Sequence, residues 1–184
     1  MSVERHVRVA STGRYVPARR VTNAELEATL GYPFDEWLVA NVGIRARHLM
    51  ADEEVTSDLA VHAGREALER AKVRPEELDL IVVATDTPDY LSPATAAVVQ
   101  HKLGAVNAGV LDVNSACAGF VSAVNLAASA VRSDEALSKV LVVGAYGMTR
   151  YVDWKDKRTC TLFADGAGAV LLQASDRAGY LAGK

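Results

Sequence analysis

The stretch LDVNSACAGFVSAVNLAASAV, residues 111–131, decides the fold. Its first residues are typical of a strand, and residues 115–131 have the period of a helix. The polar side chains of this helix form one narrow stripe, and Ala, Val, Leu and Phe occupy nearly all of the remaining helix surface. The stripe consists of Ser115, Ser122, Asn125 and Ser129. A helix that is apolar on almost every side is normally buried on almost every side. The pattern therefore predicts a second layer outside this helix, and a free-standing monomer is not expected.

Strands and helices alternate on both sides of this stretch. We predict strands at residues 6–11, 79–85 and 139–146 and helices at residues 56–71 and 94–103. DLIVVAT, residues 79–85, is a continuous β-branched run of the kind found in parallel strands that are covered on both faces. The alternation predicts an α/β fold of βαβ units with a mainly parallel sheet and right-handed crossovers.

The two ends of the chain add smaller elements. TNAELEATL predicts a short helix behind an Asn or Thr cap, and FDEWLVANVG predicts a second one that stops at Gly43. Near the other end, CTLFA and AGAVLLQAS predict a closing pair of strands around a tight DGAG turn, with Cys160 as a core residue. This glycine run lacks the Gly-Lys-Ser/Thr ending of a phosphate loop and leads into a strand, so nucleotide binding there is not expected.

Composition excludes several classes of function. The 184 residues are 50% hydrophobic with a formal net charge of −3, and Lys and Arg are scattered, so nucleic acid is not an expected partner. The charged N-terminal residues do not resemble a signal peptide, and no run reaches the roughly 20 apolar residues of a membrane span, so we expect a cytoplasmic protein. Cys117 and Cys160 have no CxxC spacing, so we expect free thiols, no metal site and no cofactor.

Cys117 lies where a strand turns into a helix, between the small residues Ala116 and Ala118. The N-terminal end of a helix lowers the pKa of a thiol, and small neighbours let a substrate carbonyl approach the backbone. The N–H of Cys117 could then serve as one oxyanion donor. A free cysteine is also among the residues most often buried as packing, so the local pattern leaves a nucleophile and a core residue both open.

DVNSACAGF resembles the active-site stretch of the β-ketoacyl-acyl carrier protein synthase III family of the thiolase-like superfamily. Four further segments resemble that family in its order and spacing: DEWLVANVGIRARHL, LDLIVVAT, VLVVGAYGMTR and TLFADGAGAVLL. Together these segments cover nearly the whole chain. We therefore expect residues 1–184 to form the N-terminal half of such a synthase, with the C-terminal half absent.

The resemblance implies a thiolase-like fold, in which two similar halves build five α-β-α-β-α layers. It also implies that Cys117 takes an acyl group from an acyl thioester and passes it to the carbanion formed by decarboxylation of a malonyl thioester. In the family, a histidine and an asparagine of the C-terminal half assist decarboxylation. None of this chain's histidines is expected to replace them: His6, His48, His62 and His101. The chain alone is therefore expected to be incomplete for full turnover.

The resemblance also assigns binding residues. In the family a tryptophan and an arginine clasp the adenine of CoA, and Trp37 and Arg158 occupy the matching positions. Asn41 and Val42 stand where the family usually has an arginine and a threonine, and Pro33 replaces a polar residue. The lost charge predicts weaker CoA binding or an acyl-carrier protein as donor, which points to a specialised secondary-metabolic relative.

Family members form homodimers, with the loop that here reads DTPDYLSP reaching the neighbour's acyl pocket. Ser92 replaces a bulky gate of some members, so longer or branched acyl groups are expected to fit. Phe163 is a candidate wall of the same pocket. The expected partners are acyl and malonyl thioesters, an acyl carrier protein and a second copy of the chain.

Two other functions stay open from the sequence. The cysteine could serve a related acyl transfer, to an alcohol or amine or in making hydroxymethylglutaryl-CoA. Alternatively, the chain could be a non-catalytic subunit that modulates chain length. A thiol retained at Cys117 argues against the second alternative, because a scaffold does not need one there.

Overall fold

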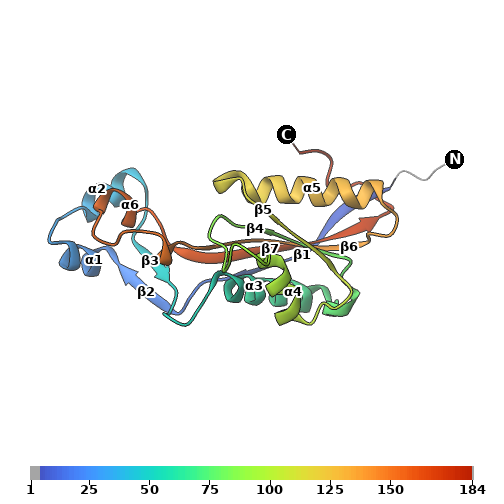
Figure 1. Ribbon diagram of the computed structural model, residues 1–184. Coiled ribbons are helices and arrows are strands. Elements are labelled where there is room, and N and C mark those ends of the chain that lie inside the picture. The colour runs from blue at the N-terminus through green and yellow to red at the C-terminus, as the bar shows by residue number, and fades with distance from the viewer. Residues whose placement is uncertain (1–4, 184) are drawn as a thin grey trace.

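A five-stranded mixed sheet forms the centre of the computed structural model, which describes residues 5–183 (Figure 1). Its strand order is β1-β7-β6-β4-β5. Strand β4 pairs in parallel with both β5 and β6, whereas β7 runs antiparallel to its two neighbours. The strands are β1 (His6–Tyr15), β4 (Leu80–Ala84), β5 (Gly109–Val113), β6 (Lys139–Gly147) and β7 (Asp165–Ser175). The predicted α/β class with a mainly parallel sheet is confirmed.

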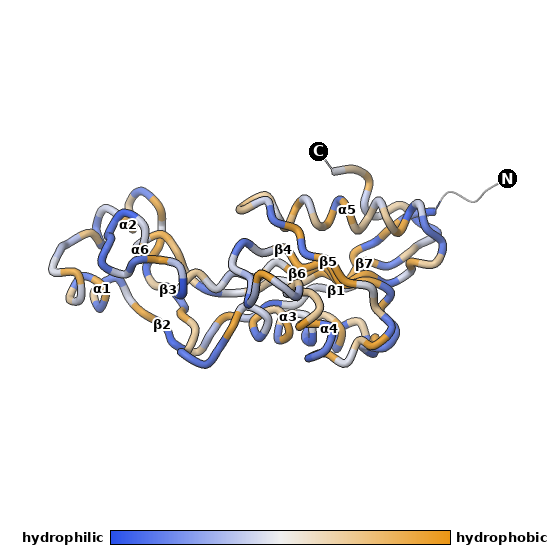
Figure 2. Tube along the Cα trace, viewed as in Figure 1, coloured by the Kyte–Doolittle hydropathy of each residue, from blue (hydrophilic) through white to orange (hydrophobic). Residues whose placement is uncertain are grey.

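Helices cover both faces of this sheet. One face packs against α3 (Thr56–Ala71) and α4 (Thr95–Leu103), and the other packs against α5 (Gly119–Ser133) (Figure 1). Side chains of β4 alternate between the two cores, with Ile81 facing α3 and α4 and Val82 facing α5. Figure 2 shows the hydrophobic character of these central strands. The continuous apolar run therefore reflects a strand that is buried on both faces.

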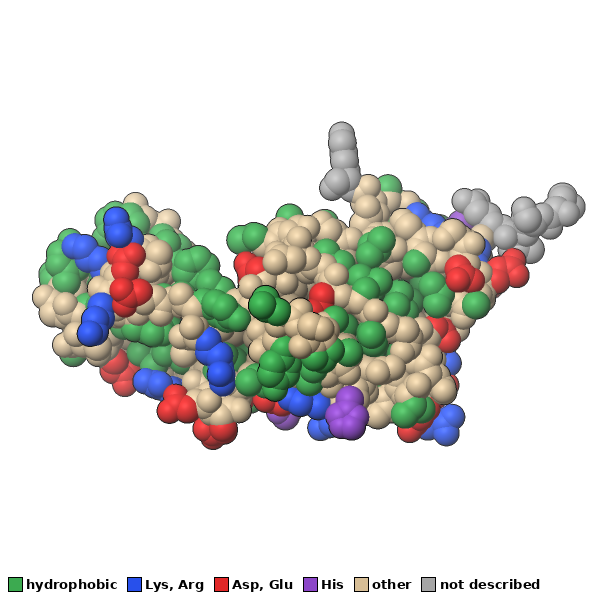
Figure 3. All heavy atoms as spheres, viewed as in Figure 1, with side chains coloured by type: hydrophobic (Ala, Val, Ile, Leu, Met, Phe, Trp, Pro, Cys, Tyr) green, Lys and Arg blue, Asp and Glu red, His purple; other side chains and the backbone are tan. Residues whose placement is uncertain are grey.

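Helix α5 starts later than the sequence pattern predicts. Residues Ala116–Ala118 form one 3₁₀ turn, and the α-helix begins at Gly119. Gly144 on β6 lets the helix approach closely, because a Cβ at this position would lie 3.0 Å from the Phe120 ring. The inner face of α5 is buried, whereas Val121 on the outer face is 58% exposed. The predicted covering layer is thus not provided by residues 5–183, and hydrophobic side chains reach the surface over the larger body of the molecule (Figure 3).

By length and composition alone, Ala116–Ser133 could cross a membrane, with a mean hydropathy of 1.2. Its packing gives a simpler reason for this composition. Ala123, Ala127 and Val131 of α5 are fully buried against the sheet. The segment therefore has the contacts of a core helix with one uncovered face.

A smaller lobe lies at one end of the sheet (Figure 1). Thr22 caps its first helix through a capping box: the Thr22 hydroxyl accepts from the Glu25 N–H, and the Glu25 carboxylate accepts from the Thr22 N–H. Both short helices predicted here are confirmed, whereas the β2–β3 pair escaped prediction because each strand has only four residues. The elements are β2 (Arg19–Thr22), α1 (Asn23–Leu30), α2 (Asp35–Asn41), β3 (Ala46–Leu49) and α6 (Lys157–Cys160).

Of the closing pair of strands predicted near the C-terminal end, AGAVLLQAS is confirmed as part of β7, whereas the other strand and the turn are wrong. CTLFA is not a strand: Asp156 caps α6 through the Arg158 N–H, and this helix ends at Cys160. The DGAG run is not a turn either, because it lies inside β7 with neither glycine at positive φ. Gly166 pairs with Tyr146 and Gly168 pairs with Gly144, so these glycines continue the ladder with β6. The prediction that Cys160 is buried is confirmed.

A buried arginine holds the smaller lobe together. Arg47 is 3% exposed and donates to the Asn23 side-chain oxygen at 2.7 Å and to the Thr161 carbonyl at 3.3 Å. The Asn23 amide in turn donates to Asp35 at 2.6 Å. Arg47 therefore links the start of α2 to the residue that follows α6. Burial lowers the pKa of this guanidinium, and no described carboxylate forms an ion pair with it.

Strand β1 and helix α3 approach each other so closely that a glycine is required. A Cβ on Gly13 would overlap the Ala63 carbonyl oxygen and lie 2.6 Å from the Ala67 nitrogen. Gly13→Ala should lower the free energy of unfolding by about 1–3 kcal/mol, measured by urea denaturation of the complete protein. Gly168→Ala is the matched control, since nothing lies within 4 Å of a Cβ there. Equal stability of the two variants would contradict this packing.

Arg47→Lys should destabilise the smaller lobe, because a single ammonium cannot reproduce the planar set of donors that meets several oxygens at once. We expect a loss of about 2 kcal/mol, the scale of a hydrogen bond to a charged group, in the same measurement. Arg45→Lys makes the same change at an exposed side chain two residues away and should be nearly neutral. A neutral Arg47→Lys would show that the network does not contribute to stability.

Candidate active site

The carboxyl ends of three parallel strands meet at one edge of the sheet. Ala84 of β4 lies opposite Val113 of β5 and Gly144 of β6. The residues that follow these positions include Asp86, Cys117 and Tyr146, each from a different strand end. Open α/β sheets place their ligand sites at this edge.

Cys117 sits in a strained turn between β5 and α5. Ala116 has φ +46°, in the left-handed region that costs a residue with a Cβ about 1–2 kcal/mol. The turn is closed by hydrogen bonds from the Ala118 N–H to the Ser115 carbonyl and from the Gly119 N–H to the Ala116 carbonyl. Asn114 accepts from the Ala116 N–H at 3.4 Å, and Ser115 makes no side-chain cap. The Cys117 side chain is exposed among the described residues.

Tyr146 reaches this turn from β6. Its hydroxyl donates to the Ala116 carbonyl at 2.5 Å. Burial raises the pKa of Tyr146, and the negative charges of Asp86 and Cys117 raise it further. The Asp86 Oδ1 atom is buried, and residues 5–183 supply no hydrogen-bond partner for it. The sequence motifs gave no indication of the roles of Tyr146 or Asp86, because only the strand register brings Tyr146 to the Cys117 turn and Asp86 near Tyr146.

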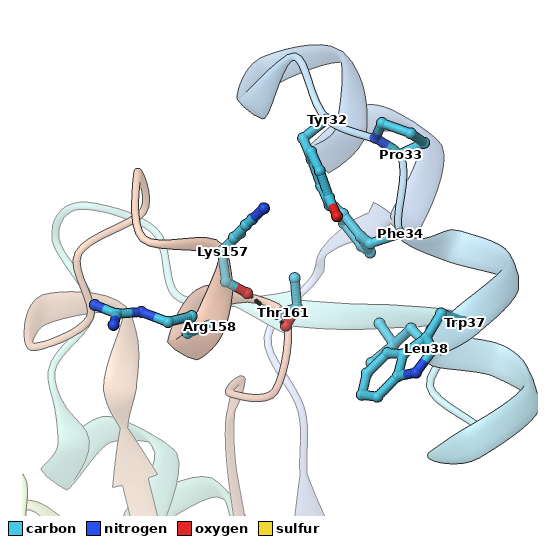
Figure 4. Close-up of a pocket in the computed structure, with 8 residues that line it drawn as sticks. All are labelled: Tyr32, Pro33, Phe34, Trp37, Leu38, Lys157, Arg158 and Thr161. Atoms are coloured by element: carbon cyan, nitrogen blue, oxygen red, sulfur yellow. Dashed lines mark hydrogen bonds between the residues drawn. The ribbon is translucent and has the colours of Figure 1, made fainter.

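A separate cavity of about 310 Å³ lies in the smaller lobe (Figure 4). This volume is at the lower end of the range typical of small-molecule pockets, about 300–1,000 Å³. Trp37 and Arg158, predicted to act together, both line the cavity. The complete lining is Tyr32, Pro33, Phe34, Trp37, Leu38, Lys157, Arg158 and Thr161.

The predicted pair lines the cavity without stacking across it. Trp37 is 61% exposed, and the Arg158 guanidinium points away from it and pairs with Asp156 at 3.0 Å (Figure 4). Lys157 was not predicted, yet its ammonium lies 3.3 Å from the centre of the Tyr32 ring. A cation over an aromatic face is a favourable arrangement, so the lobe holds two cationic side chains beside an aromatic surface.

Three other predicted site residues lie outside the lining of this cavity. Asn41 ends α2, where its side chain donates to the Trp37 carbonyl at 2.8 Å. Ser92 is exposed in the loop between β4 and α4. Phe163 is 38% exposed between α6 and β7. The described residues therefore group Trp37 with Arg158, place Asn41 next to Trp37 outside the cavity lining, and leave Ser92 and Phe163 at separate positions.

Comparison with known proteins gives consistent matches. The sequence profile of 3-oxoacyl-[acyl-carrier-protein] synthase III matches residues 111–183. The chain is 49% identical over 181 residues to the β-ketoacyl-[acyl-carrier-protein] synthase III of Xanthomonas euvesicatoria, covering 98% of this chain and 55% of that protein. The synthase III of Xylella fastidiosa strain Temecula1 is 50% identical with the same coverage.

Solved structures agree with the sequence matches. The 3-oxoacyl-[acyl-carrier-protein] synthase III of Aquifex aeolicus is similar with a TM-score of 0.88 and 40% identity, over 93% of this chain and 55% of that chain. The priming β-ketosynthase of the R1128 polyketide pathway has a TM-score of 0.91 and 40% identity, over 97% of this chain and 53% of that one. The chain spans about half the length of these relatives. It has the thiolase-like fold, and over nearly its whole length it is similar to the N-terminal part of 3-oxoacyl-[acyl-carrier-protein] synthase III proteins.

Proposed function

We propose that this chain carries the nucleophile of a decarboxylative condensing acyltransferase of the synthase III type. The observation that carries the proposal is the placement of Cys117: an exposed thiol in a strained turn, at the edge where β4, β5 and β6 end. Strained backbone of this kind persists where the surrounding structure holds it, and it is concentrated at functional sites.

In the first step, the Cys117 thiolate attacks the carbonyl carbon of an acyl thioester. A new C–S bond forms, the C–S bond to the donor breaks, and the donor leaves as a thiol after taking up the proton that Cys117 had lost. In the second step, loss of CO₂ from a malonyl thioester leaves a carbanion, which attacks the acyl carbon and releases the Cys117 thiolate.

The resemblance assigns assistance in the second step to a histidine and an asparagine outside this chain. Two of the chain's own histidines already have structural contacts. His48 Nδ1 lies 2.6 Å from the Pro17 carbonyl oxygen, and His62 stacks on Tyr15 with ring centres 4.4 Å apart. We therefore propose that full turnover needs a C-terminal half with the same fold.

The cavity of the smaller lobe is the proposed site for the nucleotide of an acyl-CoA donor. Trp37 offers an exposed aromatic face, and Lys157 and Arg158 supply positive charge for phosphate groups. Arg158 would have to turn from Asp156 to stack on a purine. Asn41 lies next to this site without a charge of its own, so we retain an acyl-carrier protein as the second possible donor.

Further parts of the proposal concern the acyl group and the assembly. Ser92 leaves room for longer or branched acyl chains, and Phe163 forms one wall of their pocket. The likeness to a polyketide priming enzyme supports a donor range beyond that of bulk fatty acid synthesis. We also propose a homodimer that works in the cytoplasm without a cofactor, in keeping with two free cysteines.

Cys117→Ala should abolish covalent acylation, because the acceptor of the acyl group is removed. The measurement is intact mass spectrometry of the complete protein after incubation with a panel of acyl-CoAs and acyl-carrier proteins. Cys160→Ala is the matched control, since burial raises the pKa of the Cys160 thiol and keeps it protonated and unreactive. Labelling of Cys117→Ala equal to that of the parent, or no adduct with any donor, would overturn the nucleophile assignment.

Trp37→Ala should weaken acyl-CoA binding about tenfold, the scale of one lost aromatic stacking contact. Acylation by an acyl-carrier protein should be unchanged, because this donor has no adenine. The measurement is the half-saturating concentration of each donor in the acylation reaction. Lys155→Ala, a change in the exposed loop before α6, serves as the control. A Trp37→Ala variant with unchanged CoA affinity would place the nucleotide elsewhere.

A further inference from the structure

The carbonyl of Ala116 accepts two hydrogen bonds. One comes from the Gly119 N–H and closes the 3₁₀ turn. The other comes from the Tyr146 hydroxyl at 2.5 Å, from a strand that is 30 residues away in sequence. A carbonyl held by two donors, one of them on a different element, has a fixed direction.

This direction sets that of the Cys117 N–H. The Ala116–Cys117 peptide bond is trans, since Ser92–Pro93 is the cis bond of the described chain. In a planar trans peptide the C=O and the N–H point in opposite directions. The N–H of Cys117 therefore points away from Tyr146, and it has no hydrogen-bond acceptor among residues 5–183. An unpaired donor beside an exposed thiol is the arrangement that an oxyanion site requires.

We propose that Tyr146 is a positioning residue for the acylation step: by holding the Ala116 carbonyl, it aims the Cys117 N–H at the oxyanion that forms when the thiolate attacks a thioester. This inference rests on the proposed function of Cys117. Tyr146 does not touch the substrate in this scheme. Tyr146 influences the reaction only through the orientation of the Ala116–Cys117 peptide plane.

The surroundings of Tyr146 suit this task. The hydroxyl lies close to the Gly119 backbone, since a Cβ at Gly119 would stand 3.4 Å from it, an ordinary contact distance. The charged or ionisable groups whose fields act on the phenol are Asp86 and Cys117, and both are negative when ionised. With its pKa raised, Tyr146 remains protonated through the neutral range and keeps its donor.

The strain at Ala116 explains why an external anchor is needed. A residue with a Cβ at φ +46° tends to relax toward negative φ, and such a change would rotate the following peptide plane. The bond from Tyr146 opposes that rotation. A hydrogen bond to the carbonyl also polarises the peptide, which makes its N–H a stronger donor.

Tyr146→Phe tests the proposal, because it removes the hydroxyl and retains the ring. The complete protein is mixed with whichever of acetyl-, butyryl- and octanoyl-CoA labels the parent fastest, and the rate of Cys117 acylation is followed by time-resolved intact mass spectrometry. We expect the maximal rate to fall about tenfold, less than the 10²–10³ for complete loss of an oxyanion donor, with an unchanged half-saturating concentration. Tyr151→Phe is the matched control, since its exposed hydroxyl also donates to a backbone carbonyl, that of Pro88.

Alkylation by iodoacetamide separates positioning from general damage. This reagent reacts at a saturated carbon with loss of iodide, so it needs the Cys117 thiolate but forms no oxyanion. Its rate at Cys117 between pH 6 and 9 should be the same in Tyr146→Phe and in the parent. Slow acylation with normal alkylation supports the proposal.

The other outcomes overturn it in distinguishable ways. Equal acylation rates for Tyr146→Phe and the parent reject Tyr146 as a positioning residue and leave Cys117 as the nucleophile. A parallel loss of acylation and alkylation shows that Tyr146 merely keeps the turn folded. A parent that alkylates at Cys117 but accepts no acyl group from acyl-CoAs or from the corresponding acyl-carrier proteins refutes the proposed function, and the inference falls with it.

Discussion

The parallel pairing of β4 with both β5 and β6 is the constraint on which the rest of the structure depends. Residues Ile81–Ala84 are completely buried, so this strand has helices on both faces and strands on both edges. Its register aligns the ends of three strands at one edge of the sheet. A thiol, a carboxylate and a phenol that are far apart in the sequence thereby become neighbours in space.

Small residues allow the helices to come close enough to maintain that edge. Gly144 admits the Phe120 ring, and Gly13 admits the backbone of α3. On the inner side of α5, Ala123 and Ala127 keep the helix close to the sheet, so the turn that holds Cys117 lies directly above the strand ends. The distance at which α5 packs on the sheet therefore sets the position of the Cys117 turn.

Buried polar contacts join the segments of the smaller lobe, in addition to buried hydrophobic side chains such as Leu38. Arg47 connects the segments that form the two sides of the cavity. Asp165 fastens the lobe to the sheet: its carboxylate accepts from the Met50 N–H at 2.6 Å and from the Thr149 N–H at 2.8 Å at the start of β7. A ligand in the cavity would thus be held by walls whose spacing is set through backbone hydrogen bonds.

The sequence by itself determined the elements whose pattern is local and strong: the βαβ alternation, the helix at 56–71, the position of Cys117 before a helix, and a family resemblance that the comparisons confirm. It failed at CTLFA, where strand propensity is overridden by the helix cap at Asp156, and at DGAG, where the turn tendency of the glycines is overridden by pairing with β6. Only the tertiary structure decided which side chains surround Cys117. Hydrogen-bond register between distant strands brings Tyr146 to the Ala116 carbonyl, and no local pattern in the sequence carries that register.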